Sequence, residues 1–336
     1  MPKVSVIMPA YNAGKYIREA INSILSQTFS DFEFIILNDC STDSTEEIIL
    51  SYHDPRIVYV KNEKNLGVAA TLNRGLEMAR GEYIARMDAD DISLPERFAK
   101  QVAYMDEHQG VAVCGCAINL FTDNKIGDIR KFPSNPVRAQ LQLLFSPCIA
   151  HPSAVLRRQA LDEHNLHYNL SFEGTEDYAL WWEIGKYGTL VALSDCLLFY
   201  RVHPQQVSQN GNTRVKSAFI PFAAKRLLDL NVSGDDMAAT VLYEYTSGML
   251  SGADASRVEK FIEVIGAIKD SKVAMDRFGI KPLRRYLEKS VYECIENSDA
   301  DRGEKKSLYR LSKNAGFHTG KYRLKYLYAQ VLRRIK

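Results

Sequence analysis

The 336-residue sequence lacks long apolar runs and has no strong excess of either charge. No stretch approaches the ~20 consecutive apolar residues that a transmembrane helix needs. The formal net charge is only +2, which argues against a dedicated nucleic-acid-binding protein. The apolar run at the N-terminus is short and ends at Pro9, which is not the pattern of a secretory signal peptide. We therefore expect a cytoplasmic protein that binds no nucleic acid.

Cysteine pairs with the spacing of a metal or redox motif are also missing. The six cysteines are scattered and form no Cys-x-x-Cys pair, which indicates reduced thiols rather than a disulfide framework or a zinc site. Hydrophobic residues make up 46% of the chain and charged residues 25%, the usual balance of a globular protein. The length favours one large domain with a smaller addition.

Strand-like and helix-like segments alternate over the first 90 residues. Short apolar runs indicate buried strands, and the segments between them carry apolar residues at helical spacing. We expect strands at 4–8, 32–37, 57–60 and 83–87, and helices at 15–27, 45–52 and 68–79. Short connections between alternating elements predict an α/β fold with a doubly wound, mostly parallel sheet and helices on both faces.

The alternation loosens after residue 110. Further strands are expected at 111–121, 153–157 and within 190–202, and a capped helix is expected near 174–188. From about residue 215 only helical patterns remain. We therefore predict an α/β domain over 1–212, with halves 1–110 and 111–212, and a helical C-terminal region over 213–336.

Acidic residues gather where the fourth expected strand ends, in the segment MDADD at 87–91. Crowded carboxylates repel one another unless a cation or hydrogen bonds offset the repulsion. Mg²⁺ and Mn²⁺ prefer oxygen ligands and often bind through one or two carboxylates and substrate phosphates. Ligands of doubly wound sheets bind at the carboxyl ends of the strands, so Asp88 and Asp90 are candidate metal ligands. The alternative is that Asp91 caps a following helix.

Four motifs, in this order and spacing, resemble the family 2 glycosyltransferases with the GT-A fold. They are MPKVSVIMPAYNAGKYI, SILSQTFSDFEFIILNDCSTDST, NEKNLGVAATLNRGLEMARGEYIARMDADD and EGTEDYALWWEIGKYG, and the resemblance covers residues 2–210. It implies transfer of a sugar, with inversion, from a nucleotide-diphosphate donor, usually with Mn²⁺ or Mg²⁺ as cofactor.

The resemblance assigns the donor side residue by residue. Asp39 matches the acid that accepts the ring N–H of the base, which favours a UDP-sugar, and Asp90 matches the direct metal ligand. Arg86 is expected either to reach the diphosphate or to form a structural ion pair. The donor-binding candidates are Pro9, Ala10, Tyr11, Asn12, Asp39, Asn65, Gly67, Asn73, Arg86, Asp88 and Ala89.

Three positions depart from the family pattern. Asn38 replaces the usual acid before Asp39, and it can still accept and donate hydrogen bonds. Cys40 replaces the usual glycine after Asp39, from which we predict that this position does not need a positive φ. Leu72 stands where many members carry an arginine, which puts one phosphate contact in doubt.

The segment GTED supplies candidates for the catalytic base. Single-step inversion needs a group that removes the proton of the acceptor hydroxyl. Asp177 is the first candidate and Glu176 the second, and the alternative is a charged first turn of a helix. Because a carboxylate is a weak base at neutral pH, we predict a partly apolar site that raises the pKa of Asp177.

Other residues are candidates on the acceptor and metal sides. Trp181 and Trp182 follow the candidate base on the same expected helix, either as an acceptor-binding platform or as core residues. His203 is a candidate third metal ligand, because a late histidine can complete the metal site in relatives with the GT-A fold; the alternative is a surface or core histidine. Tyr200 and Arg201 are expected to help shape the acceptor pocket.

Residues 305–336 contain ten Lys or Arg and no Asp or Glu, with apolar residues interleaved. A basic amphipathic helix of this kind binds anionic membrane surfaces, at ~1 kcal/mol for each cation. The alternative is a solvated helix packed on the protein. We therefore expect peripheral attachment to the inner face of the cytoplasmic membrane, which suits a lipid-linked glycan acceptor.

The leading interpretation is an inverting, metal-dependent glycosyltransferase that uses a UDP-sugar to extend a cell-surface polysaccharide or lipopolysaccharide. Transfer to polyprenyl phosphate is an alternative, which the missing transmembrane segments disfavour. A nucleotidyltransferase would carry a Gly-rich, lysine-containing phosphate loop, which PAYNAG lacks. A non-catalytic nucleotide-sugar-binding scaffold is disfavoured because Asp39, Asp90 and Asp177 are all present.

Overall fold

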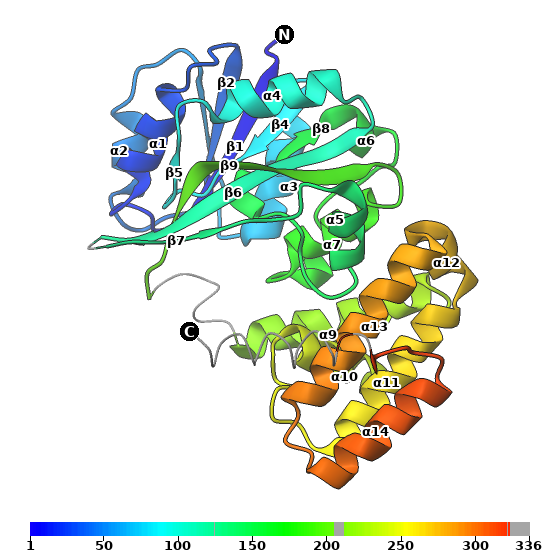
Figure 1. Ribbon diagram of the computed structural model, residues 1–336. Coiled ribbons are helices and arrows are strands. Elements are labelled where there is room, and N and C mark those ends of the chain that lie inside the picture. Colours follow the sequence, from blue (N-terminus) through cyan, green and yellow to red (C-terminus); the bar gives the residue numbers. More distant parts are fainter. Residues whose placement is uncertain (124, 205–211, 321, 323–336) are drawn as a thin grey trace, which may run out of the picture. The chain divides into compact units, whose positions relative to one another are not determined.

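The computed structural model describes residues 1–123, 125–204, 212–320 and 322 (Figure 1). The chain forms two compact units. The first comprises Met1–Leu143 and Pro147–Val215, and the second comprises Leu144–Ser146 with the chain from Lys216 onward. The segment Leu144–Ser146, which we expected in the α/β domain, therefore belongs to the helical unit.

The four apolar runs of the first 90 residues form parallel strands, and the helices between them are also as predicted. These elements are β1 (Val4–Ala10), α1 (Ile17–Leu25), β2 (Phe32–Asn38), α2 (Thr45–Leu50), β3 (Ile57–Lys61), α3 (Val68–Met78) and β4 (Tyr83–Arg86). The strands lie in the order β3-β2-β1-β4, with Val4 opposite both Phe32 and Tyr83. The carboxyl ends of these strands consequently share one edge of the sheet.

The second half of the sheet is mixed rather than mostly parallel. Its strands are β5 (Ile92–Ser93), β6 (Val111–Thr122), β7 (Lys125–Arg130), β8 (Val155–Arg157) and β9 (Thr189–Arg201). The complete order is β3-β2-β1-β4-β8-β6-β9-β5, with β7 paired to β6. β8 pairs antiparallel with β4 and β6, whereas β6 and β9 pair parallel. Only two residues separate β6 from β7, and so short a connection permits only antiparallel pairing.

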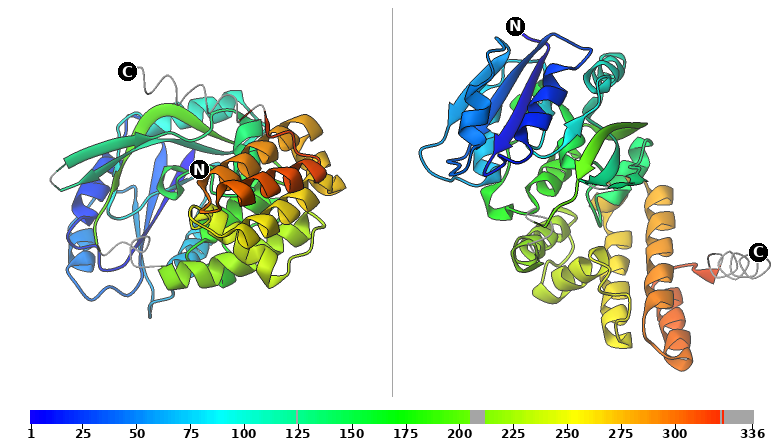
Figure 2. Two further views of the ribbon diagram at one scale, coloured as in Figure 1. Left: turned by 60° about the horizontal axis from the view of Figure 1, so that its bottom comes forward. Right: turned by 90° about the vertical axis from the view of Figure 1, so that its left-hand side faces the viewer.

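Helices cover both faces of the parallel half (Figure 2). On one face, Val6 of β1 packs in a core cluster with Ile21 of α1 and Phe98 of α4 (Arg97–Glu107). On the other face, Gly75 of α3 lies against Ile7, and a Cβ at Gly75 would stand 2.5 Å from Ile7 Cγ2. The absent side chain therefore lets α3 approach the sheet closely.

Short helices connect the remaining strands of the first unit. They are α5 (Pro136–Gln142), the 3₁₀ turns η1 (His151–Ser153) and η2 (Leu170–Phe172), α6 (Arg158–Asp162) and α7 (Glu176–Ile184). α5 starts with a proline, and its N-cap Asn135 accepts a hydrogen bond from the Arg138 N–H at 3.1 Å. α7 presents its first two residues, both acidic, at its N-terminus.

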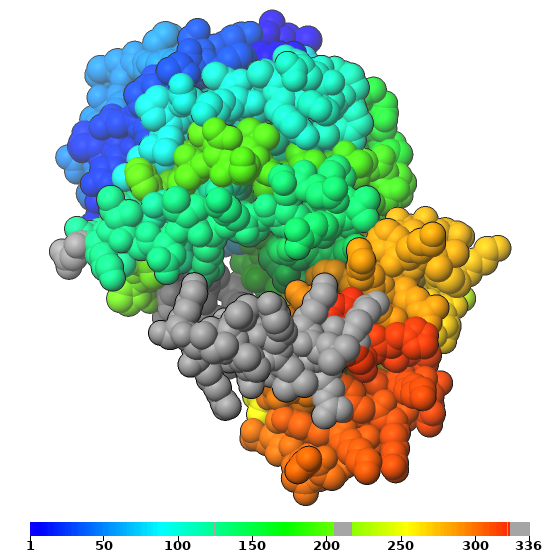
Figure 3. Space-filling view, viewed as in Figure 1, coloured from blue at the N-terminus to red at the C-terminus, as the bar shows by residue number. Residues whose placement is uncertain are grey.

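The second unit is helical, and its helices form a packed body of their own (Figure 3). They are α9 (Asn212–Asp229), α10 (Asp236–Thr246), α11 (Ala255–Asp270), α12 (Lys272–Phe278), α13 (Ile280–Asn297) and α14 (Arg302–Asn314). Within this unit, the Phe145 ring packs against the rings of Tyr245, Phe261 and Tyr286, at centroid distances of 4.9, 6.4 and 5.7 Å. In the part of the chain that the structure describes, no helix is long and apolar enough to cross a bilayer.

Candidate active site

The loop after β4, residues 88–91 and hereafter the acid loop, gathers three carboxylates. Asp88, Asp90 and Asp91 each place an oxygen within 4.8 Å of the others, at the carboxyl edge of the parallel strands. Burial and the Asp88 charge raise the pKa of Asp90, and burial with both neighbouring carboxylates raises the pKa of Asp91. The raised pKa values mean that the protein leaves the negative charge incompletely compensated. This oxygen-rich donor set fits a hard divalent cation.

Two basic side chains adjoin the acid loop. The Arg86 guanidinium, buried at the end of β4, forms an ion pair with Asp88, so the structural ion pair that we considered is present. His203 places Nε2 2.9 Å from Asp90 Oδ2. The structure thus brings all the predicted metal-site residues together, and a ring nitrogen and two carboxylates could share a cation there.

Asp91 is not the helix cap that we considered as an alternative. It is fully buried, and its Oδ1 accepts the Arg201 main-chain N–H at 2.8 Å. The next long helix, α4, begins only at Arg97 and has Glu96 at its N-cap. Asp91 instead joins the acid loop to the end of β9.

Asp39 organises the turn between β3 and α3. Its Oδ1 accepts from Asn62 Nδ2 at 2.7 Å and from the Leu66 N–H at 2.8 Å, and its Oδ2 accepts from the Gly67 N–H at 3.0 Å. Asn65 Oδ1 also accepts from the Gly67 N–H, at 3.1 Å. Gly67 has φ +85°, and a Cβ there would stand 2.5 Å from a carboxylate oxygen of Glu173. The predicted donor-side residues Asp39, Asn65 and Gly67 therefore form one hydrogen-bonded turn.

The segment after β1 faces the segment after β2. Pro9 and Ala10 end β1, and the Tyr11 ring beyond them is exposed. Asn12 has φ 49°, and its side-chain oxygen accepts from the Thr42 N–H at 2.8 Å. Our prediction for Cys40 is wrong, because its φ is 62°. Its neighbour Ser41 donates its N–H to Asn38 Oδ1 at 2.9 Å, and its hydroxyl oxygen accepts the Asn12 N–H at 3.0 Å, so the turn around Cys40 is fixed in a conformation that glycine adopts most easily.

Two predicted donor residues are engaged by the protein itself. Asn73 donates from Nδ2 to the Tyr168 carbonyl and accepts the Tyr168 N–H at Oδ1, both at 2.8 Å. Its amide therefore clamps α3 to the segment before α7. Ala89 is buried in the hydrophobic core, so its methyl group presents almost no surface to a ligand.

The predicted base lies in the first turn of α7. Burial and the Glu176 charge raise the pKa of Asp177 to about 7, in agreement with the expected direction. Burial also raises the pKa of Glu176, whose Oε2 accepts the Gly174 N–H at 2.5 Å. The positive charge of Arg86 lowers the pKa of both residues and that of Asp90 as well. Arg86 is thus an electrostatic neighbour of both the acid loop and the candidate base.

The acceptor platform that we considered for Trp181 and Trp182 is wrong. Both indole rings are fully buried, so the core-packing alternative is correct. The Trp181 ring meets the His151 ring edge-on, with centroids 6.0 Å apart. His151 Nε2 in turn lies 2.9 Å from the Tyr168 hydroxyl. The apolar side of α7 therefore anchors the helix that carries Asp177.

Arg201 also differs from our expectation. We placed it at an acceptor pocket, but its side chain is 4% exposed and contacts the acid loop instead. Its carboxylate partners, Glu19 and Asp123, were not among the predicted site residues. The only sequence signal was the YRVHP segment, which places Arg201 two residues before His203.

Comparison with known proteins gives the family. The model of glycosyl transferase family 2 matches residues 5–164. An uncharacterized glycosyltransferase of Haemophilus influenzae is 37% identical over 222 residues, which cover 62% of this chain and 68% of that protein. The Escherichia coli UDP-Glc:alpha-D-GlcNAc-diphosphoundecaprenol beta-1,3-glucosyltransferase WfaP is 33% identical over 213 residues, which cover 62% of this chain and 81% of that protein.

The fold agrees with this family. The crystal structure of S. aureus TarS 1–349 aligns with a TM-score of 0.57 and 20% identity, covering 96% of this chain and 92% of that one. Across the first three curated relatives, the chain spans between 50% and 68% of their own length. The sequence matches and the mixed GT-A-type sheet together show that this chain belongs to the family 2 glycosyltransferases.

Proposed function

We propose that the protein transfers a sugar with inversion from a UDP-sugar, in the presence of Mn²⁺ or Mg²⁺, to a glycan or lipid-linked glycan during cell-surface polysaccharide synthesis. The observation that carries this proposal is the pairing of two different carboxylate groups in one unit. The acid loop holds three carboxylates within 4.8 Å, and Asp177 has a pKa of about 7. The first group suits a cation, and the second suits a proton acceptor at neutral pH.

The names of relatives favour this donor and acceptor class. WfaP is named for UDP-Glc and for an acceptor linked to diphosphoundecaprenol. A Bacillus subtilis relative, 31% identical over 218 residues, is named as a putative teichuronic acid biosynthesis glycosyltransferase. TarS was crystallised with UDP-GlcNAc. These names support a UDP-sugar donor and a surface-polymer acceptor.

On the donor side, the exposed Tyr11 ring offers a flat face for the base, next to the turn that Asp39 organises. Asp88, Asp90 and His203 would hold the cation. A bound cation would neutralise negative charge on the departing diphosphate. The Asp90 side chain is only 20% exposed, and it would contact the donor diphosphate through the cation rather than directly.

On the acceptor side, deprotonated Asp177 accepts the proton of the acceptor hydroxyl as that oxygen attacks the anomeric carbon. The Asp177 Oδ1 also accepts the Tyr178 N–H at 2.7 Å, which fixes the direction of the carboxylate. Burial and, after it, the Glu176 charge keep the pKa of Asp177 high enough for proton transfer at neutral pH. The two acidic residues therefore have different roles.

Membrane attachment by the basic tail is also part of the proposal. Lys306, Arg310 and Lys313 of α14 are exposed, and their spacing places them along one side of the helix. Leu308 is buried within the helical unit, so the described helix offers the membrane its charge rather than an apolar face. Lys305 of the same helix is half-buried. The other predicted membrane-binding cations, at 321, 323, 325, 333, 334 and 336, lie outside the described residues.

Thermal unfolding of the full chain tests the donor class. UDP, GDP, ADP and CDP are each added with and without Mn²⁺, since a ligand that binds only the folded state stabilises it by about 2.7 kcal/mol at 100 times Kd. We expect UDP to stabilise the protein only with Mn²⁺, and Asp90→Ala to remove the effect. Stabilisation by another nucleotide alone, or by none, would contradict the proposal.

A further inference from the structure

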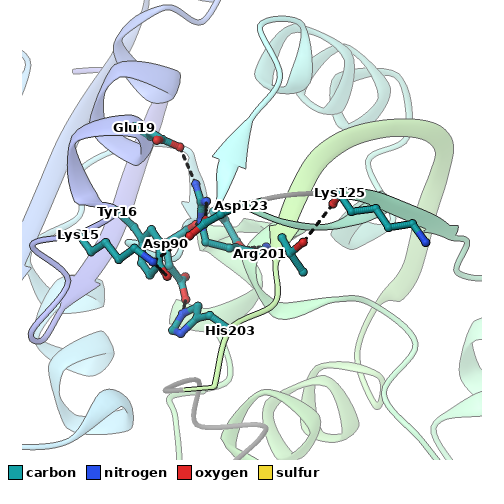
Figure 4. Close-up of polar contacts among 10 residues, drawn as sticks. Lys15, Tyr16, Glu19, Asp90, Asp123, Lys125, Arg201 and His203 are labelled. Carbon is teal, nitrogen blue, oxygen red and sulfur yellow. Dashed lines mark hydrogen bonds and ion pairs between the residues drawn. The ribbon is translucent and has the colours of Figure 1, made fainter.

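Arg201, the last residue of β9, is the point where four parts of the first unit meet (Figure 4). Its guanidinium lies between the rings of Tyr16 and Phe121, at 4.5 and 4.4 Å from their centroids. A buried arginine is costly unless its charge and its donors are satisfied. The partners of Arg201 therefore indicate what its burial achieves.

Arg201 holds the acid loop through main-chain and side-chain bonds together. Its main-chain N–H donates to Asp91 Oδ1, and its Nε–H donates to the Asp90 carbonyl, both at 2.8 Å. Neither bond uses the Asp90 carboxylate. Two residues later, His203 reaches that carboxylate from the same segment. The end of β9 thus fixes the backbone of the acid loop through Arg201 and contacts one oxygen of the Asp90 carboxylate through His203.

The charge of Arg201 is neutralised outside the acid loop. One terminal nitrogen donates to Asp123 Oδ1 at 2.8 Å, and the other donates to Glu19 Oε2 at 2.5 Å. Asp123 also pairs with Lys15 at 2.8 Å (Figure 4). Because these two carboxylates compensate the guanidinium charge, Arg201 can lie beside the candidate cation site without forming an ion pair with the Asp90 carboxylate.

We propose that Arg201 is a positioning residue that aligns Asp90 and His203 for the donor-bound cation, and that Glu19 and Asp123 keep its charge from the acid loop. This inference rests on the proposed metal-dependent function. Lysine cannot replace Arg201, because a single ammonium group does not provide the planar fork that joins the Asp90 carbonyl, Asp123 and Glu19.

Mn²⁺ binding in the presence of saturating UDP tests the inference without an activity assay. Free Mn²⁺ is measured by electron paramagnetic resonance at a temperature where circular dichroism shows each variant to be folded. We expect Arg201→Lys and Arg201→Gln to weaken Mn²⁺ affinity about 10- to 100-fold, the usual effect of losing a residue that orients metal ligands. Without Mn²⁺, neither the wild type nor the variants should bind UDP detectably.

Arg157 provides a matched control. It is also buried, and it donates to the Met105 carbonyl at 2.8 Å and to the Val111 carbonyl at 3.2 Å. Arg157→Lys should lower the melting temperature but keep wild-type Mn²⁺ affinity. Equal losses of affinity in the Arg157 and Arg201 variants would overturn the inference, because they would indicate a general structural effect.

The exposed partners of Arg201 give a second test that does not depend on folding of an Arg201 variant. The side chains of Glu19 and Asp123 are 59% and 46% exposed, so the double variant Glu19→Gln/Asp123→Asn should fold. We expect it to weaken Mn²⁺ affinity, and less than additively when combined with Arg201→Lys. Wild-type affinity in the folded variants would refute the inference, whereas absence of Mn²⁺–UDP binding by the wild type would refute the proposed function itself.

Discussion

The acid loop and the first turn of α7 both crowd carboxylates, but the protein supports the two regions differently. The acid loop is held from outside by Arg86, Arg201 and His203. Glu176 and Asp177 accept hydrogen bonds from main-chain N–H groups of their own segment, at Gly174 and Tyr178. The acid loop, with basic side chains around it, can still take a cation as a further partner. The first turn of α7 has main-chain N–H donors instead, and Asp177 there can take up a proton.

Removal of the candidate base should give the largest effect on turnover. We expect Asp177→Asn to lower kcat by about 10²–10⁴-fold, because an amide cannot accept the proton of the acceptor hydroxyl. Binding of UDP with Mn²⁺ should be unchanged, since the acid loop is intact. UDP release and calorimetric UDP binding measure the two quantities. Glu183→Gln, a change on the same helix at an ion pair with Lys186, is the control and should keep normal turnover.

Loss of a metal ligand should show the opposite pattern. We expect Asp90→Asn to weaken Mn²⁺ affinity in the presence of UDP by about 100-fold or more, beyond the usual effect of a residue that only orients ligands. Titration of Mn²⁺ followed by electron paramagnetic resonance measures this loss. Asp162→Asn removes an exposed carboxylate that pairs with Arg158 at 3.6 Å, and it should bind Mn²⁺ normally. Normal binding by Asp90→Asn would show that the acid loop is not the metal site.

The pH dependence of kcat should separate the two regions more finely. Because the pKa of Asp177 is about 7, the base is increasingly protonated below that pH. On this acidic limb of the pH profile, below about pH 7, we expect kcat to fall about tenfold for each pH unit. Glu176→Gln removes a negative charge that raises the pKa of Asp177, so the limb should move to lower pH. A limb that stays in place would exclude Asp177 as the titrating base.

The smallest expected effect is on stability. Asp177 has a higher pKa in the folded state than its ordinary value of 3.8, so the folded state favours the protonated form. The contribution of this group to stability is therefore present at low pH and is lost as the pH rises toward 7. We expect the melting-temperature difference between Asp177→Asn and wild type to be more positive at pH 8 than at pH 5. The change should be about 2–4 °C for each kcal/mol of unfolding free energy that the wild type loses between these pH values. An equal difference at both pH values would contradict a raised pKa of Asp177 in the folded state.

Local pattern was sufficient to predict the parallel half of the sheet. β1, β2 and β4 are short, mostly apolar segments, and α1 repeats apolar residues at helical spacing, so neighbouring residues specify these elements. The same pattern placed polar residues at strand ends, which is how Asp39, Asp88 and Asp90 were found. The resemblance to a known family added Asp177 and His203.

The features that we missed depend on residues far apart in the chain. Arg201 contacts Asp90 across 111 positions, and no local pattern connects them. The burial of Trp181 depends on packing with residues such as His151, and a helical pattern alone gave two interpretations of that tryptophan. The positive φ of Cys40 depends on two loops that meet only in the folded sheet.

The membership of Leu144–Ser146 in the helical unit has a consequence for how the protein is made. Phe145 leaves the ribosome about 100 residues before Tyr245, its first aromatic partner in the chain, since synthesis proceeds from the N-terminus. Until then the ring contacts with Tyr245, Phe261 and Tyr286 cannot form. A gene shortened after codon 215 would remove all three of these ring partners, so the α/β unit should be produced with its helical neighbour rather than alone.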